Sequence, residues 1–150
     1  MTYEALIEEK EKLLKDKKEN EAKIREIDSK IQYYEFLYSN CLTNIRIHKE
    51  NITNYNKIMK YEKRSKTLFD MSGMFRLPSI SDYCVNRIID FETEIKKLEK
   101  DADRIQQTLD IYIALKKYII DENEEKSFRI EEIDLSIGSK EKVLTKGEIQ

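Results

Sequence analysis

The sequence predicts an all-α fold: a long antiparallel coiled-coil hairpin of two helices, with an N-terminal helical overhang and a C-terminal tail. Apolar side chains recur with a seven-residue period through both halves of the chain, which is the pattern of coiled-coil helices. The single Pro, Pro78, stands close to Gly73 near mid-chain and marks one break between two helices. Charged residues make up 39% of the chain, so its apolar residues suffice for seams rather than for a thick globular core.

The first helix is expected to span residues 3–66. Its heptad positions a and d hold Ile24, Ile31, Tyr38, Ile45, Ile52 and Met59 at a, and Ile27, Tyr34, Cys41, His48 and Tyr55 at d. Toward the N-terminus, Lys10 and Lys17 fall at a and Asn20 falls at d. Leu6 and Leu13 still hold d positions. The polar interruptions predict an overhang that a partner or a second copy would order.

A turn over residues 67–78 is expected to lead into a second helix over residues 79–121, which Ser79 can cap. Its seam positions are Cys84, Phe91, Leu98, Ile105, Tyr112 and Ile119 at d, and Ile88, Ile95, Ala102 and Leu109 at a. The hairpin would then occupy residues 1–125. Residues 126–150 are predicted to be a tail, flexible or a short strand, because apolar residues alternate there with period two. These residues are Phe128, Ile130, Ile133, Leu135 and Ile137.

The heptads predict the alignment of the two helices only to within one heptad. One antiparallel alignment sets Ile45 opposite Ile105, and it sets the large His48 opposite the small Ala102. A shift by one heptad would face His48 with Ile95 instead. Both alignments bring apolar residues together, so both remain open.

Apolar character extends beyond the seam in two regions at the same level of the hairpin. The first lies around residues 33–42, and the second, around residues 111–120, makes the second helix apolar on more than one side. A wider core accounts for such residues, and so does a binding face, because Tyr offers large contact area with a polar tip. We expect a docking site or a dimer interface there. The predicted partner-binding residues, with two from the overhang, are Leu6, Leu13, Tyr33, Phe36, Leu37, Ile113 and Ile120.

Composition and motifs argue against several classes of function. The formal net charge of -2, with both signs mixed along the chain, does not favour binding to nucleic acid. The chain contains no apolar run of about 18 residues, so we expect no membrane insertion. The N-terminus does not read as a cleaved signal peptide, which predicts a cytoplasmic protein or one exported without cleavage.

The reactive side chains do not form a recognisable catalytic or metal motif. His48 lies on the seam one heptad from Cys41, and two ligands are too few for a zinc site. The sequence therefore predicts no enzyme, no cofactor and no metal. A metal or redox enzyme that uses Cys41, His48 and Cys84 is the contrasting interpretation.

Two helices joined by a turn with Met71-Ser72-Gly73 and Phe75 resemble the small helical hairpins of WXG type. With its longer arms, the chain is similar to the YwqH-like proteins associated with LXG toxins of the type VII secretion system. In that group the turn carries Trp-x-Gly and a nearby Phe, so Gly73 and Phe75 match and Met71 replaces Trp. A Tyr-x-x-x-Asp/Glu export motif after the second helix would correspond to Tyr118 and Glu122. The resemblance implies a targeting or chaperone-like partner of a secreted toxin.

The function predicted from the sequence is a non-enzymatic helical interaction protein, whose partner is a helical protein domain. The type VII toxin partner is its most specific form. A second interpretation is a phage or mobile-element protein that inhibits a host or defence factor by protein–protein binding. A third is a structural coiled-coil adaptor that forms a homodimer.

Overall fold

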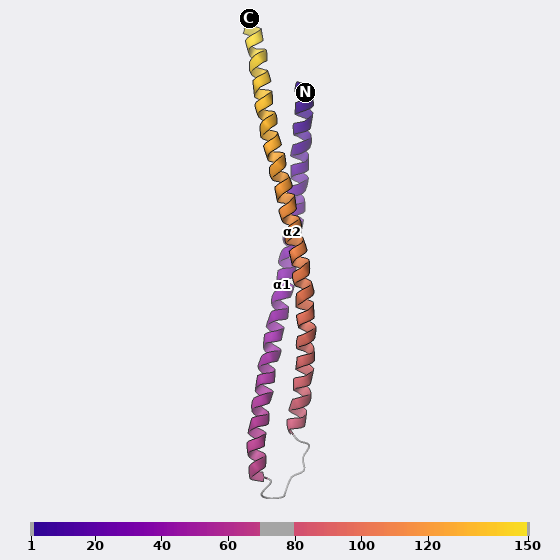
Figure 1. The fold of residues 1–150 in the computed structure, drawn as a ribbon, viewed down its shortest axis with the longest axis vertical. Helices are drawn as coiled ribbons and strands as arrows, with labels where there is room; N and C mark the ends of the chain where they lie inside the picture. Colours follow the sequence, from indigo (N-terminus) through magenta and orange to yellow (C-terminus); the bar gives the residue numbers. More distant parts are fainter. Residues whose placement is uncertain (1, 70–79, 150) are drawn as a thin grey trace. The chain divides into compact units, whose positions relative to one another are not determined.

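The computed structural model describes residues 2–69 and 80–149, with side chains over residues 2–63 and 80–143. It contains two α-helices, α1 over Tyr3–Phe69 and α2 over Ile80–Ile149 (Figure 1). These described residues include no strand. The predicted all-α helical hairpin is therefore confirmed. The turn residues Gly73 and Phe75 and the capping residue Ser79 lie outside the described residues.

Helix α1 begins with a side-chain cap. The backbone N–H of Ala5 donates to Oγ1 of Thr2 at 3.2 Å, and the N–H of Leu6 donates to the carbonyl of Thr2 at 3.1 Å. Glu4 lies in the first turn, where its negative charge is favourable beside the helix dipole. Thr2 therefore fixes the start of the helix.

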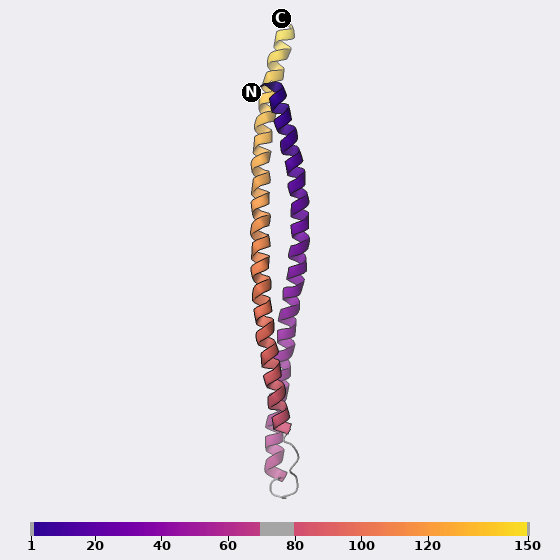
Figure 2. The ribbon, with the colours of Figure 1, turned by 90° about the vertical axis from the view of Figure 1, so that its right-hand side faces the viewer.

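The helices pack in two units, each described by itself. Unit 1 comprises Met1–Tyr33 and Leu109–Gln150, and unit 2 comprises Tyr34–Thr108. In unit 1, the N-terminal part of α1 and the C-terminal part of α2 lie side by side in both ribbon views (Figures 1 and 2). Each unit is thus a pair of antiparallel helix segments.

The predicted N-terminal overhang is wrong, because α2 accompanies this part of α1. The hydroxyl of Tyr3 donates to Oε1 of Glu141 at 3.3 Å, and Nζ of Lys10 lies 2.6 Å from Oδ1 of Asp134. Leu6 is buried. A lysine at a seam position can lay its aliphatic stem along the seam while its ammonium reaches the edge. Lys10 therefore does not interrupt the packing, contrary to the expectation from the sequence.

The predicted end of the second helix at residue 121 and the predicted tail at 126–150 are also wrong. Helix α2 continues to Ile149. Ile130, Ile133 and Ile137 continue the heptad as a, d and a, and Ile133 is 0% exposed. The spacing of the apolar residues in this segment fits both a strand and a helix. Packing against the facing segment of α1 favours the helix.

Cross-helix contacts in both units agree with the alignment that is shifted by one heptad. The alignment with Ile45 opposite Ile105 is therefore wrong, and the one that brings His48 to the level of Ile95 is confirmed. The contacts that establish it are Asn20–Asn123 and Asp28–Lys116 in unit 1 and Glu62–Ser81 in unit 2.

Over residues 2–63 and 80–143, the buried side chains all lie on the two seams. With the heptad of α2 extended through residue 137, each buried residue occupies an a or d position. The buried hydrophobic residues are Leu6, Ile27, Ile45, Cys84, Ile95, Ala102, Leu109, Ile119 and Ile133. The core is therefore a single layer between two helices in each unit.

One layer of the unit 1 seam pairs two asparagines. Asn20 is 6% exposed, and its Nδ2 donates to Oδ1 of Asn123 at 2.9 Å. The Nδ2 of Asn123 donates in turn to the carbonyl of Lys17 at 3.4 Å. A buried amide without partners costs about 1–3 kcal/mol, so this pair favours the alignment in which the two asparagines meet.

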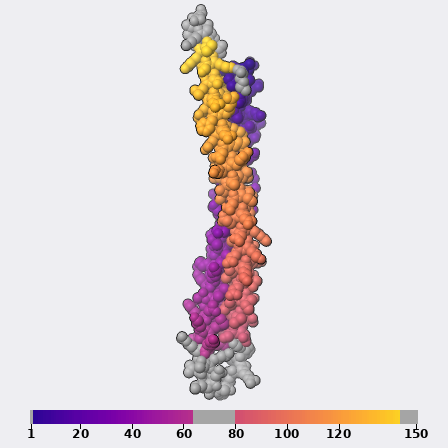
Figure 3. Space-filling view, viewed as in Figure 1, coloured from indigo at the N-terminus to yellow at the C-terminus, as the bar shows by residue number. Residues whose placement is uncertain are grey.

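Unit 2 has an aromatic cluster toward the N-terminal end of α2. The ring of Phe91 lies 5.3 Å from the ring of His48 and 5.8 Å from that of Tyr55, centroid to centroid. Tyr55 also meets Tyr83 edge to face, and the guanidinium of Arg87 lies 5.0 Å from the Phe91 ring centroid. Side chains of both helix segments are in contact along this unit (Figure 3). His48 therefore belongs to a packed aromatic layer.

Candidate protein-interaction surface

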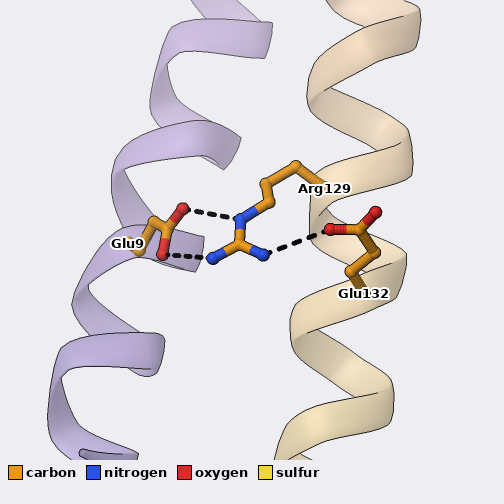
Figure 4. Close-up of polar contacts among 3 residues, drawn as sticks. All are labelled: Glu9, Arg129 and Glu132. Atoms are coloured by element: carbon orange, nitrogen blue, oxygen red, sulfur yellow. Dashed lines mark hydrogen bonds and ion pairs between the residues drawn. The ribbon is translucent and has the colours of Figure 1, made fainter. Parts of the chain in front are cut away.

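One side of the unit 1 seam carries a charged cluster centred on Arg129 (Figure 4). The Nε of Arg129 donates to Oε1 of Glu9 at 2.8 Å, and its Nη2 donates to Oε2 of Glu9 at 3.0 Å. The Nη1 of Arg129 reaches Oε2 of Glu132 at 3.2 Å. Two parallel hydrogen bonds to one carboxylate fix the direction of the guanidinium. We call this side of the seam the Arg129 flank.

The cluster shifts the pKa of both partners. The hydrogen bond from Arg129 lowers the pKa of Glu9 below its ordinary value of 4.5, because it favours the charged carboxylate. The hydrogen bond to Glu9, followed by that to Glu132, raises the pKa of Arg129. Glu9 therefore stays ionised to a lower pH in the folded protein than in the unfolded chain.

Replacing Glu9 by glutamine is expected to lower the melting temperature modestly at pH 7 and to have less effect in acid. Because the pKa of Glu9 is lowered on folding, its stabilising contribution is present above about pH 5 and is lost as the pH falls through the lowered value. Thermal melts of both proteins at pH 7 and pH 3 would measure this. Glu11→Gln, at an exposed glutamate of the same helix segment, is the control. A difference that grows on acidification would contradict the prediction.

Exposed apolar side chains of α2 form a stripe on the Arg129 flank. Ile111, Leu115 and Tyr118 follow the spacing i, i+4 and i+7, which places them on one face of a helix. Leu115 and Arg129 are two heptads apart, so the stripe continues the flank that carries Arg129. The exposed fractions are 67% for Ile111, 44% for Leu115 and 67% for Tyr118. We call these three residues the Tyr118 surface.

The predicted binding residues of unit 1 do not lie together. Tyr33 is exposed, and its heptad position places it on the Arg129 flank. Ile113 and Ile120 are exposed at the heptad position on the opposite side of the seam. Leu6 is buried and Leu13 is half-buried, so both belong to the seam instead of an open face. Ile111 and Leu115, which were not among the predicted site residues, complete the stripe instead.

The predicted export pair lies inside α2 rather than after its end. Tyr118 is exposed, and Glu122 follows one turn later with Lys126 Nζ 3.4 Å from its Oε1. Since α2 continues to Ile149, the pair does not follow the second helix. Both residues face outward from the same stripe of this helix.

In unit 2, Phe36 is exposed and Leu37 is half-buried beside a shallow hollow. The hollow occurs where Cys41 lies at the level of Ala102, because two small side chains in one layer leave space. Its lining residues are Leu37, Asn40, Cys41, Asn44, Asp101, Arg104 and Ile105. Leu37 thus lines a defect of the seam, while Phe36 points away from it.

The sulfur and imidazole groups are distributed along the seams. Cys41 and Cys84 are free thiols, and His48 packs on Phe91. Within the described residues, no group of three or more His, Cys, Asp or Glu side chains is placed to hold a metal ion. Over the same residues, neither helix has a stretch apolar and long enough to cross a bilayer.

Comparison with known proteins does not place the chain in a family. No family model, no curated protein and no solved structure matches it.

Proposed function

We propose that the protein is a non-enzymatic helical interaction protein that binds another helical protein through the Tyr118 surface. The observation that carries the proposal is the exposure of Ile111, Leu115 and Tyr118 along one stripe of α2. Adjoining apolar side chains that stay open to solvent in a helical pair mark a contact site for a further helix. A partner helix with its own i, i+4, i+7 apolar stripe fits this surface.

The resemblance to hairpin proteins of type VII secretion gives the proposal a narrower form. In that form the partner is the helical N-terminal domain of a secreted LXG toxin, and the protein acts as its targeting or chaperone-like partner. This form rests on the sequence resemblance at Gly73 and Phe75, because Tyr118 and Glu122 lie inside α2 rather than after its end. A phage or mobile-element inhibitor would use the same surface on a host or defence factor.

A photo-crosslinking amino acid at residue 118, introduced in the native host, tests the proposal. We expect an adduct with a helical segment of another polypeptide, and we expect Leu115→Glu in the same chain to abolish it. The matched control is the same probe at Phe128, which is 66% exposed on the same helix but outside the stripe. The partner segment is identified by peptide mapping.

The pattern of adducts separates the outcomes. An adduct from residue 118 that maps to the N-terminal domain of a toxin supports the narrower form, and one that maps to a host regulator supports the inhibitor. Equal labelling from residues 118 and 128, or labelling that survives Leu115→Glu, would contradict a binding role for the Tyr118 surface.

A further inference from the structure

We propose that a second copy of this chain covers a charge-free stripe on α1 of unit 2, bound antiparallel so that asparagine meets asparagine and isoleucine meets isoleucine. The stripe occupies the g and c positions beside the seam over residues 44–61, and we call it the Asn51 stripe. Its residues are Asn44, Ile47, Asn51, Asn54, Ile58 and Tyr61. All of them belong to unit 2, so the inference does not use the Tyr118 surface, which belongs to unit 1.

The Asn51 stripe carries no charge although it is open to solvent. Charged residues make up 39% of the chain, and the outward positions of a helix are where they usually lie. Ile47, Ile58 and Tyr61 are 41%, 44% and 74% exposed, and the asparagines among them are exposed or half-buried. Successive members are three or four residues apart in alternation, which is the spacing of a coiled-coil seam. Helix α1 therefore carries a second seam that α2 does not cover.

The g and c positions of both helices lie on one side of unit 2. They line the same hollow, which α1 borders with Asn40 and Asn44 and α2 borders with Asp101 and Arg104. A helix that covers the Asn51 stripe would therefore also approach this side of α2.

The start of α2 adds apolar side chains beside one end of the stripe. The hydroxyl of Ser81 donates to Oε2 of Glu62, which sets the start of α2 level with this end. Ile80 and Tyr83 occupy g and c positions of α2 here, and both are exposed. Four exposed apolar side chains of the two helices thus form one patch. They are Ile58, Tyr61, Ile80 and Tyr83.

A second copy fits the Asn51 stripe in one antiparallel register. With a two-fold axis between residues 52 and 53, Ile47 lies opposite Ile58 of the second copy, and Asn51 lies opposite Asn54 of the second copy. Asn44 lies opposite Tyr61 of the second copy, whose hydroxyl can bond the amide. Each pair occurs twice in such an isologous contact, so every position of the stripe is matched.

An asparagine pair already favours one alignment within the chain. Asn20 donates to Asn123 at 2.9 Å in the seam of unit 1. A carboxamide is both donor and acceptor, so two of them satisfy each other, whereas an isoleucine opposite an asparagine leaves the amide without a partner. The layer of Asn51 and Asn54 would select the register of the second copy in the same way.

Other arrangements match the stripe less well. A shift by one heptad in one direction sets Ile47 against Asn51, and a shift in the other direction sets Asn54 against Ile58. Each shift buries an amide against an apolar side chain. A parallel, in-register pair sets each residue against itself, but its two helix dipoles point the same way, which is less favourable than the opposed dipoles of an antiparallel pair.

The stripe continues beyond residue 44 toward the N-terminus of α1. Leu37 and Asn40 hold the next g and c positions. In the proposed register their counterparts in the second copy lie beyond residue 63, outside the side chains that the structure describes. The inference therefore rests on residues 44–61 alone.

Sedimentation equilibrium of the purified full-length chain tests the inference. We expect the average mass to rise from monomer to dimer between about 10 μM and 1 mM. Ile47→Glu should raise the dissociation constant by about 100-fold, because it sets a carboxylate against an apolar side chain twice. Leu42→Glu is the matched control, since Leu42 is 47% exposed on the same helix segment but on the other side of the seam, and it should leave the dimer unchanged.

The asparagine layer provides a test that does not depend on the isoleucines. Asn51→Leu should weaken the dimer by about 10-fold, because Asn54 of the second copy would lose its partner twice. Adding Asn54→Leu to the same chain sets leucine against leucine and should make the dimer tighter than the wild type. Circular dichroism of each variant verifies that the helices are retained.

Disulfide crosslinking measures the orientation. Ile47→Cys and Ile58→Cys are made in separate chains that also carry Cys41→Ser, while Cys84 is 1% exposed and stays in place. Oxidation of the mixed chains should link residue 47 of one copy to residue 58 of the other, as read by mass spectrometry of the linked peptides. Either chain oxidised alone should give no such product.

Four results would overturn the inference. They are a wild-type chain that stays monomeric up to about 1 mM, equal effects of Ile47→Glu and Leu42→Glu, a failure of Asn54→Leu to reverse the effect of Asn51→Leu, and crosslinking of each singly substituted chain with itself. The last result would show a parallel pair. Because the stripe and the Tyr118 surface belong to different units, loss of one contact leaves the other to be judged by its own experiment.

Discussion

Replacing Ile133 by alanine is expected to destabilise unit 1 by about 2–5 kcal/mol, the range for truncating a buried isoleucine to alanine. Ile133 is 0% exposed, and it lies in the segment that the sequence alone assigns to a tail. Removing its side chain would open a cavity between α1 and α2 and lose apolar burial there. Chemical denaturation followed by circular dichroism measures the change.

The same substitution at Leu135 provides the comparison. Leu135 is two residues away on the outside of α2, so Leu135→Ala should change stability by only about 0.5 kcal/mol or less. If the two substitutions cost the same, residues 126–143 would not pack as a helix against α1, and the seam of unit 1 would be shorter than described.

Deleting residues 1–20 is expected to lower the melting temperature by about 10 °C or more. The deletion removes Leu6 from the core, Glu9 from Arg129, and Asn20 from its partner in α2. Loss of several kcal/mol shifts the melting temperature of a domain of this size by about 2–4 °C per kcal/mol. The facing part of α2 would remain as a single helix, which is marginal in water.

Hydrogen exchange locates this effect. In the truncated chain, amides of residues 123–143 should lose protection, whereas those of unit 2 should keep it. The control is the full-length chain with Leu14→Ser, a change at an exposed side chain of the same segment. Unchanged protection over 123–143 after the deletion would restore the interpretation of the N-terminal segment as an overhang.

The two seams could be predicted from the sequence because the heptads are regular over Ile24 to Met59 and over Cys84 to Ile119. The alignment of the two seams could not be predicted, because sliding one helix by seven residues still sets apolar residues of similar character opposite each other. The residue that distinguishes the two alignments is the polar Asn20. In the unshifted alignment Asn20 would meet Ile130, and a buried amide would have no partner.

The extent of the hairpin could not be predicted for a related reason. Lys10, Lys17 and Lys126 occupy seam positions, and lysines there suggest that a seam has ended. Long aliphatic stems tolerate such positions when the ammonium reaches an acidic neighbour, as Lys10 reaches Asp134. That compensation depends on which residue of the other helix stands opposite, so it becomes visible only in three dimensions.

The sequence predicts that apolar residues are enriched at the candidate surface, but it does not predict which of them lie on the same side of α2. An excess of apolar residues around 111–120 is plain in the sequence. Which of them share a side depends on where the seam runs across α2. The seam separates Ile113 and Ile120 from the Arg129 flank, whereas Ile111, Leu115 and Tyr118 lie together on it. The binding residues predicted on this helix, Ile113 and Ile120, therefore lie on the side opposite to the stripe.

The contact between Asn20 and Asn123 selects the correct alignment of the two helices only late in folding. Ser81 and Glu62 meet across 19 residues of sequence, whereas Asn20 and Asn123 meet across 103. Closure of short loops is fastest, so a hairpin that zips from the turn forms unit 2 first. If the helices paired one heptad out of register, apolar layers would still form from the turn onward. A cost in free energy would appear only at the layer of Asn20. The mistake would be detected only after most of the seam had formed, and correcting it would require the helices to separate almost completely.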